Sequence, residues 1–196
     1  MWSSSEKHSV QWKALEESLN TARKALQLLR FIDLMHSARS SIKLDDQTHR
    51  YTITMSRIAT SLYYFTDNIV YAARIGIIDV DRHKWFTRSY RFWLYALIMN
   101  LLRDAYEIQI ELERLERIHG RRSHRDLLAD VIDVCSSRPA IAVDTLKNTC
   151  DIFIPLSSLN HLPAQLSPRT IGILGAISSL CSILQMTQPS LRLIPS

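Results

Sequence analysis

Three carboxylates at helical spacing are the first residues in this sequence whose types and arrangement could do acid–base chemistry. Asp104, Glu107 and Glu111 fall on one face of a predicted helix, next to Arg103. A carboxylate row beside a cation is usually an ion-paired, solvated helix surface. Only unusual burial, which perturbs carboxyl pKa values, would make it an acid–base site. We therefore predict a solvated surface here.

Other signals for catalysis are missing from the sequence. It has no glycine-rich phosphate loop, no GxSxG and no HExxH pattern. His119 and His124 are five positions apart, which does not place them on one helical face. The cysteines Cys135, Cys150 and Cys181 are odd in number and include no CxxC pair, which argues against a disulfide framework or a zinc site. The prediction is a non-enzymatic protein without a cofactor or a metal.

The charge balance favours an anionic partner. Lys and Arg number 24 against 19 acids, which gives a net charge of +5 and a pI near 9.3. The loop residues Arg121, Arg122 and Arg125 could hold phosphate, but no nucleic-acid-binding motif or aromatic platform accompanies them. Nucleic acid is therefore not expected, and anionic phospholipid is the favoured partner. Charge alone is also consistent with a soluble basic protein.

A cationic, one-sided helix offers the chemistry of a membrane surface. The segment 10–42 is predicted to be one amphipathic helix, with apolar side chains on a broad face and cations mainly on the other side. Such a face can enter one leaflet and favour curvature while the cations meet lipid phosphates. Periodicity alone, however, favours packing on neighbouring helices over insertion. The candidate membrane-surface residues are Ala22, Arg23, Lys24, Leu26, Leu29, Arg30, Ile32 and Met35.

The last segment of the chain has the composition of a membrane span. No residue from 170 to 191 is charged, and Arg169 and Arg192 bracket the interval. Its about 22 residues are enough to cross a hydrocarbon core of about 30 Å, and the alternative is a buried helix of a soluble protein. Small residues recur four apart on it, which lets helices approach closely in lipid. They are Gly172, Gly175, Ala176 and Ser179.

Two long helices are predicted between these membrane-binding candidates, over 48–118. Gly76 is the natural residue to end the first, and Asp81 is a candidate N-cap for the second. The second helix contains the apolar run Phe92–Leu102, which spans only about 16 Å as helix, roughly half of a hydrocarbon core. This run is therefore predicted to be buried in a bundle, interfacial, or part of a tilted span.

Short helices are predicted over 123–160, and Pro155, Pro163 and Pro168 indicate a loop before the last segment. The chain has only four Gly and six Pro, so long stretches carry no helix breaker. The predicted fold is all-α. It is a helical bundle of amphipathic and hydrophobic helices with a C-terminal membrane-spanning helix, in a single domain of residues 1–196.

Three stretches of the chain together resemble the peroxisomal membrane protein 11 (peroxin-eleven) family. The first is ARKALQLLRFIDLMHSA, and the third is LKNTCDIFIPLSSLNHLPAQLSPRTIGILGAISSLCSIL. The second stretch carries a DN pair, a glycine, a KW pair, an RFW-like triplet and an NLxRDxYE pattern. Its residues are Asp67, Asn68, Gly76, Lys84, Trp85, Arg91, Phe92, Trp93, Asn100, Leu101, Arg103, Asp104, Tyr106 and Glu107. Family members usually carry tens of residues before the first stretch, whereas this chain has about twenty.

The resemblance implies a peroxisomal membrane protein that promotes membrane elongation, fission and peroxisome proliferation. The family's amphipathic helix, thought to bend the bilayer, matches Thr21–Arg39 here. Self-association and recruitment of a dynamin-related GTPase with tail-anchored fission adaptors are implied as well. Two alternatives stay open: a pore for small metabolites, with Arg91, Asn100 and Arg103 as lining candidates, and a soluble helical adaptor.

Overall fold

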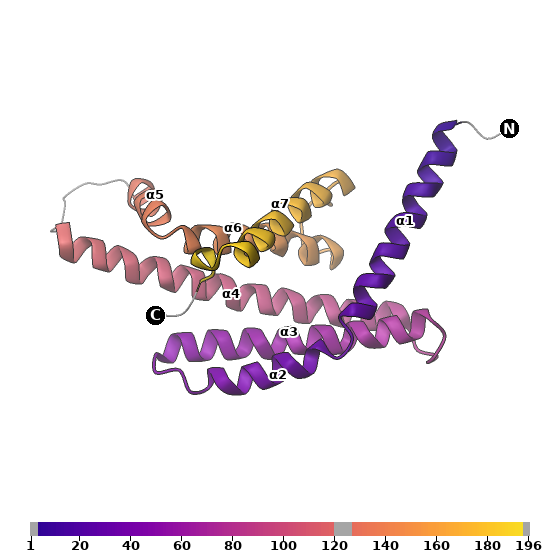
Figure 1. Cartoon of the computed structure of the whole chain (residues 1–196), viewed down its shortest axis with the longest axis horizontal. Coiled ribbons are helices and arrows are strands. Elements are labelled where there is room, and N and C mark those ends of the chain that lie inside the picture. The colour runs from indigo at the N-terminus through magenta and orange to yellow at the C-terminus, as the bar shows by residue number, and fades with distance from the viewer. Residues whose placement is uncertain (1–3, 120–126, 194–196) are drawn as a thin grey trace.

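The computed structural model describes residues 4–119 and 127–193, with side chains from 10–117 and 131–193. Within these residues the regular structure is entirely helical, which confirms the predicted all-α class (Figure 1). The basic loop with Arg121, Arg122 and Arg125 lies outside the described residues. The elements are α1 (Ser4–Leu26), α2 (Arg30–Ser41), α3 (Gln47–Arg74), α4 (Arg82–His119), α5 (Leu127–Ser137), α6 (Pro139–Ser158), α7 (Pro168–Thr187) and the 3-10 turn η1 (Pro189–Leu191).

The centre of the molecule is the antiparallel pair α3 and α4. Helix α2 packs on α3 from one side, whereas α6 and α7 lie on the other side of α4 (Figure 1). Polar side chains fix the α3–α4 register, since the Ser56 hydroxyl donates to the Asn100 side-chain carbonyl at 2.5 Å. Helix α1 extends away from this bundle and contacts only the end of α3 near its own last turn (Figure 1).

The two predicted capping residues lie where α3 ends and α4 begins, and a third cap, which was not predicted, lies at the start of α3. Asp46 caps α3, because its carboxylate accepts a hydrogen bond from the His49 backbone N–H at 2.7 Å. Gly76 ends this helix with a φ of 81°, and Asp81 accepts from the backbone N–H groups of His83 and Lys84. The predicted roles of Gly76 and Asp81 are confirmed.

The leading segment differs from the single helix predicted over 10–42. Leu29 has a φ of 65°, so the chain breaks between α1 and α2 at residues 27–29. This conformation costs a non-glycine residue about 1–2 kcal/mol. Contacts of α2 with α3 hold it in place: Ser61 donates to the Phe31 carbonyl at 2.7 Å, and Arg57 donates to the Ser37 carbonyl at 2.8 Å. The apolar residues of 10–42 therefore do not share one continuous face.

Helices α6 and α7 form an antiparallel pair. The predicted loop begins later than expected, because α6 continues through Pro155 to Ser158. Helix α7 begins at Pro168 with Ser167 as its N-cap, whose hydroxyl accepts from the Thr170 N–H at 3.1 Å. It ends at Thr187, whereas the apolar interval was predicted to run as a span to 191.

Helix α7 packs on α6 rather than on α4, at the level of the apolar run of α4. Near one end of α6, Asp144 bonds both Arg103 of α4 and Gln185 of α7. Towards its other end, Ile154 lies 3.9 Å from where a Cβ of Gly175 would stand. Helix α7 therefore runs in the same direction as α4 and overlaps the stretch that contains Phe92–Leu102.

The interior of the bundle is more polar than that of a soluble domain. Among the described residues, buried polar or charged side chains outnumber buried apolar ones. In soluble proteins most of these residue types are exposed, and a buried polar group is the informative exception. Small hydroxyl residues between helices are typical of helix packing in membranes. The buried polar residues are Ser41, His49, Thr52, Ser56, Ser61, Thr66, Ser89, Asp104, Glu107, Glu111, Asp144, Asn148 and Ser178.

Candidate membrane interface

Helix α7 is the described helix that has both the length and the composition to cross a membrane. Its apolar side chains surround it on all sides, and only 11% of the residues in its most apolar 18-residue stretch are buried. Ile173, Leu180 and Met186 are 60%, 62% and 76% exposed. A core helix of a soluble protein would be mostly buried, so this surface fits a lipid environment better than water.

The small residues of α7 share one face, of which only the edge at Gly175 meets α6. Gly172, Ala176 and Ser179 are exposed and point away from α6, and no atom lies within 4 Å of a Cβ built on Gly172. Gly175 is half-buried and packs near Ile154 of α6. The predicted group of four is therefore three outward residues and one that serves the contact with α6.

Helix α1 exposes an apolar stripe along its length. Trp12, Leu15, Leu19 and Leu26 recur at helical spacing and are between 47% and 88% exposed. The stripe faces away from α3, because Lys24 on the other side of α1 forms an ion pair with Asp67 at 2.8 Å. The apolar stripe of α1 is therefore not packed against the bundle.

Helix α2 and the residues before it continue the exposed apolar surface beyond the break. Leu29, Ile32 and Met35 are 61%, 53% and 46% exposed, whereas Ala38 is buried against α3. The Arg30 guanidinium lies over the Tyr64 ring, 5.2 Å from its centroid, and stays exposed. These residues leave an apolar flank of α2 free next to a cation.

The other candidates of the leading segment differ in their availability to lipid. Ala22 and Arg23 are exposed on α1, as predicted for a surface that faces head groups. Lys24 has only 14% of its side chain exposed, because its ammonium group is held by Asp67. It is therefore a structural residue of the α1–α3 contact, and Arg23 and Arg30 are the cations left for phosphates.

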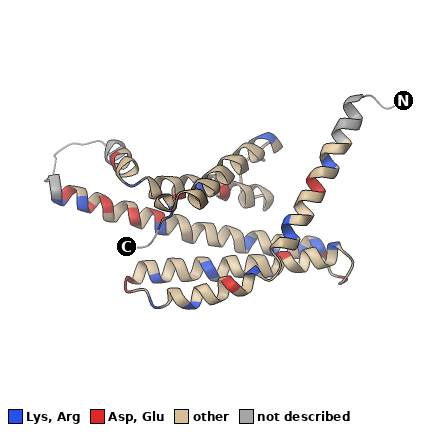
Figure 2. Ribbon diagram, viewed as in Figure 1, with Lys and Arg blue, Asp and Glu red and all other residues tan. Residues whose placement is uncertain are grey.

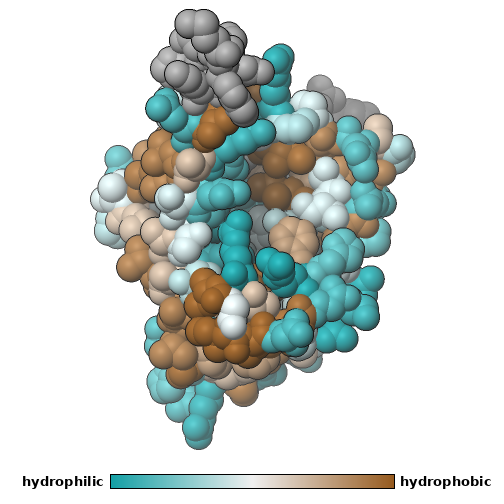
Figure 3. Space-filling model, turned by 90° about the vertical axis from the view of Figure 1, so that its right-hand side faces the viewer, coloured by the Kyte–Doolittle hydropathy of each residue, from teal (hydrophilic) through white to brown (hydrophobic). Residues whose placement is uncertain are grey.

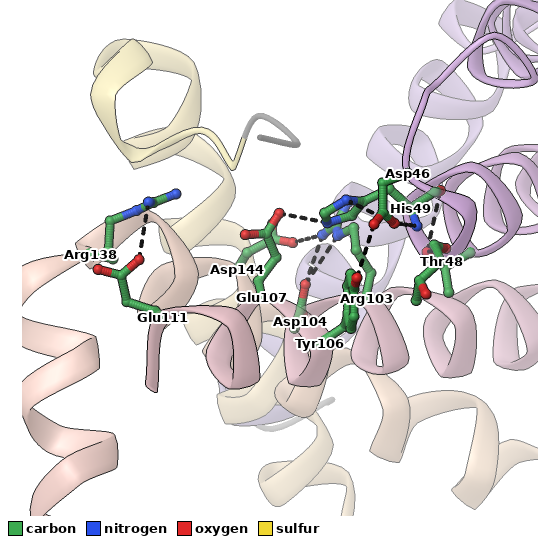
Figure 4. A network of polar contacts seen from close by, with 11 residues as sticks. Asp46, Thr48, His49, Arg103, Asp104, Tyr106, Glu107, Glu111, Arg138 and Asp144 are labelled. Carbon is green, nitrogen blue, oxygen red and sulfur yellow. Dashed lines mark hydrogen bonds and ion pairs between the residues drawn. The ribbon is translucent and has the colours of Figure 1, made fainter. Parts of the chain in front are cut away.

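The carboxylate row of α4 faces inward, which corrects the predicted solvated surface. Asp104, Glu107 and Glu111 are 0%, 2% and 7% exposed. Each lies against a cation or histidine from the chain itself, as Figure 4 shows. Burial follows from the neighbours of the row: Glu107 lies against α3, Asp104 lies against α6, and Glu111 lies against the junction of α5 and α6.

Arg103 is the centre of the first part of this network. Its guanidinium bonds Asp104 at 2.9 Å and also Asp144 of α6. The Asn148 amide donates to Asp104 at 2.7 Å, and the Gln185 amide of α7 donates to Asp144 at 2.7 Å. The network thereby connects α7, through α6, to α4.

His49 is the centre of the second part of the network. Its Nε2 lies 2.9 Å from Glu107 and its Nδ1 lies 3.4 Å from Asp46 (Figure 4). The Tyr106 hydroxyl donates to Asp46 at 2.9 Å, so these contacts join the start of α3 to the second half of α4. Farther along α4, Glu111 lies 3.4 Å from Arg138, which stands between α5 and α6.

Burial and charge act in opposite directions on the two aspartates beside Arg103. Desolvation outweighs the attraction of Arg103 at Asp104 and raises the pKa of that carboxyl to about 6. At Asp144 burial also disfavours the charge, but the Arg103 guanidinium and the Gln185 amide outweigh it and lower the pKa. Both groups face partners within the chain, so the network acts as a structural connection.

The three residues proposed to line a pore are mostly occupied by other contacts. Asn100 is bonded to Ser56 between α3 and α4, and Arg103 belongs to the buried network of α4 and α6. Arg91 is exposed on α4. The three side chains therefore do not line a common path.

Sequence reasoning did not identify the partners of the carboxylate row. Asp144 and Asn148 are four positions apart, which places them on one face of a helix, and this spacing was an available signal. His49, Arg138 and Gln185 stand in different elements and carry no local pattern. Only the fold connects them to the row, His49 and Arg138 directly and Gln185 through Asp144.

The described residues form an all-α protein with one helix of the length and composition of a membrane span, and comparison with known proteins identifies its family. The family model of Peroxisomal biogenesis factor 11 (PEX11) matches residues 2–187. The chain belongs to the PEX11 family and is a protein of the peroxisomal membrane.

Similar proteins occur in animals and plants. Human Peroxisomal membrane protein 11B is 33% identical over 221 residues, with 94% of this chain and 83% of that protein covered. Mouse Peroxisomal membrane protein 11A is 30% identical, with 92% and 80% covered. Rice Peroxisomal membrane protein 11-5 is 25% identical, with 88% and 76% covered. No solved structure matches the chain.

Proposed function

We propose that this protein elongates the peroxisomal membrane by inserting the apolar sides of α1 and α2 into one leaflet while α7 anchors it in the bilayer. The observation that carries the proposal is the exposed apolar surface of the leading segment beside the cations Arg23 and Arg30. Insertion of such a surface expands one leaflet relative to the other and favours curvature. Peroxisome elongation, fission and proliferation are the processes that this curvature serves.

The polar interior and apolar exterior support this mechanism over a soluble adaptor. Leu26, Leu29 and Ile32 are each more than half exposed, which in water is a liability rather than a contribution to stability. In lipid the same side chains leave water, at roughly 25 cal/mol for each Å² of apolar surface. Binding to a bilayer therefore lowers the free energy of the protein.

Two further activities belong to this proposal. The outward face of α7, with Gly172, Ala176 and Ser179, would let two copies approach closely in lipid and self-associate. A dynamin-related GTPase and its tail-anchored adaptors would then act on the membrane that the protein has narrowed. The family resemblance supports both activities.

The test is the shape of anionic vesicles that carry the full-length protein. The wild type should draw vesicles into tubules that electron microscopy can count. Leu29→Glu together with Ile32→Glu should remove most tubules, because two charges on the apolar flank oppose insertion.

A matched control compares one added charge on each flank of α2. Ser40 is exposed and lies farther around the helix from Ile32, so Ser40→Glu should preserve tubulation where Ile32→Glu alone reduces it. Unchanged tubulation by the Leu29 and Ile32 variant, at equal protein incorporation, would count against insertion as the mechanism.

A further inference from the structure

The turn between α3 and α4 carries isoleucines whose side chains are exposed and not packed in the interior of the bundle. Ile75, Ile77 and Ile78 are 49%, 71% and 36% exposed, and Phe86 in the first turns of α4 is 39% exposed. The turn lies at the end of the bundle near the foot of α1 (Figure 1). An apolar cluster on a tight turn indicates contact with something outside the chain.

Backbone hydrogen bonds hold this turn in a defined conformation, in which its apolar side chains are exposed. The Ile77 N–H donates to the Ala72 carbonyl at 3.0 Å and the Gly76 N–H donates to the Ala73 carbonyl at 3.4 Å, which completes the end of α3. Asp81 caps α4 from the other side of the turn. No rearrangement is needed to expose Ile77 at the tip.

Cations surround the apolar tip. Arg74, Arg82, Lys84 and Arg88 are exposed at the adjoining ends of α3 and α4, and Figure 2 shows the blue segments gathered there. The Arg88 guanidinium lies 4.8 Å from the centre of the Trp85 ring. Figure 3, which looks onto this end, shows brown side chains bordered by teal ones.

Nearby acids only partly offset these cations. The Asp81 carboxylate is held by the N-terminus of α4 and by Lys84 at 3.4 Å, and these contacts lower its pKa, the backbone hydrogen bond from Lys84 most of all. Asp79 is the remaining exposed acid of the turn. Four cations against two acids leave the tip positive, as a surface that faces lipid phosphates requires.

We propose that the α3–α4 turn is a second membrane-binding site, in which Ile77 and Ile78 enter the head-group boundary of an anionic leaflet. Arg74, Arg82 and Lys84 then contact lipid phosphates, and Trp85 lies at the interface, where its amphipathic ring is favoured. This site adds to the insertion of α1 and α2 and does not depend on it. It fixes one end of the bundle to the membrane surface near the foot of α1.

The test places a fluorescent label at the tip of the turn in the full-length protein. The label is attached at Ile77→Cys on a Cys135→Ser background, because Cys150 and Cys181 are buried. The matched control is Asp45→Cys, an exposed position in the turn between α2 and α3 at the other end of the bundle. Both variants are reconstituted into phosphatidylcholine vesicles with and without phosphatidylserine, and nitroxide lipids quench the label.

The proposal predicts several-fold stronger quenching at position 77 than at position 45, with a further increase when phosphatidylserine is present. Equal quenching at the two positions would overturn it. Quenching at 77 that disappears as the protein is diluted in lipid would also overturn it, since contact of the turn with lipid would then require assembly of several protein molecules. Adding Leu29→Glu and Ile32→Glu should leave the label at 77 quenched, so failure of this site and failure of the proposed function are distinguishable.

Discussion

Replacing Arg103 by methionine should lower the free energy of unfolding by about 3–5 kcal/mol, because it leaves buried carboxylates without their cation. Asp104 and Asp144 both depend on this guanidinium. Denaturation of the detergent-solubilised full-length protein, followed by circular dichroism, measures the change.

The pH dependence of the free energy of unfolding distinguishes the loss of a charged partner from a simple packing defect. The pKa of Asp104 is already raised to about 6 in the folded protein, above the ordinary aspartate value of 3.8, so folding favours the protonated form. The contribution of Asp104 to stability is therefore largest below pH 4 and falls as the pH rises through 6. Without Arg103 that pKa rises further, so Arg103→Met should be more damaging at pH 8 than at pH 5.

Arg114→Met is the matched control for this prediction. Arg114 also approaches an acid of the row, Glu111, at 3.7 Å, but its side chain is 62% exposed. Its loss should change the free energy of unfolding by less than about 1 kcal/mol, as for other surface ion pairs. Equal effects of the two substitutions would mean that the buried network does not hold the bundle together.

Leu180→Lys should prevent stable membrane integration. Leu180 is 62% exposed near the middle of α7, so a lysine there meets no steric obstacle in the protein. In water such a surface substitution would be nearly neutral, but at the centre of a membrane helix it costs about 2.5–3.5 kcal/mol. Flotation of the protein with vesicles after an alkaline carbonate wash, which removes protein bound only at the surface, measures the loss.

Ile132→Lys is a control with the same change at similar exposure. Ile132 is 65% exposed on α5, outside the surfaces assigned to the membrane. It should float with vesicles as the wild type does. If Leu180→Lys floats equally well, α7 does not lie in the hydrocarbon core.

Local patterns predicted the ends of the helices well. Gly76 and Asp81 act over one or two turns of backbone, so the sequence around them contains all the information needed. The start of α7 was predicted two residues too late, because Pro168 was assigned to the loop, whereas it is the first residue of the helix and Ser167 is its cap. The lack of charge over a sufficient length identifies this last helix as a candidate membrane span from sequence alone.

Tertiary contacts determined what the sequence did not reveal. The break at Leu29 contains neither Gly nor Pro, and it arises because Arg57 and Ser61 of α3 hold α2 in place. The carboxylate row was predicted to lie on the surface because its partners are distant in sequence. Asp144, for example, is 41 positions from Arg103. Periodicity identifies which residues share a face, but not which element covers that face.

The chain folds around polar contacts, and we expect its exposed apolar side chains to face lipid. Alkaline carbonate extraction of peroxisomal membranes that carry the tagged wild-type protein tests this expectation, because it strips proteins that are not embedded in the bilayer. We expect the full-length protein to remain with the membrane pellet. Its recovery in the supernatant would show that α7 lies in water, which would contradict this expectation.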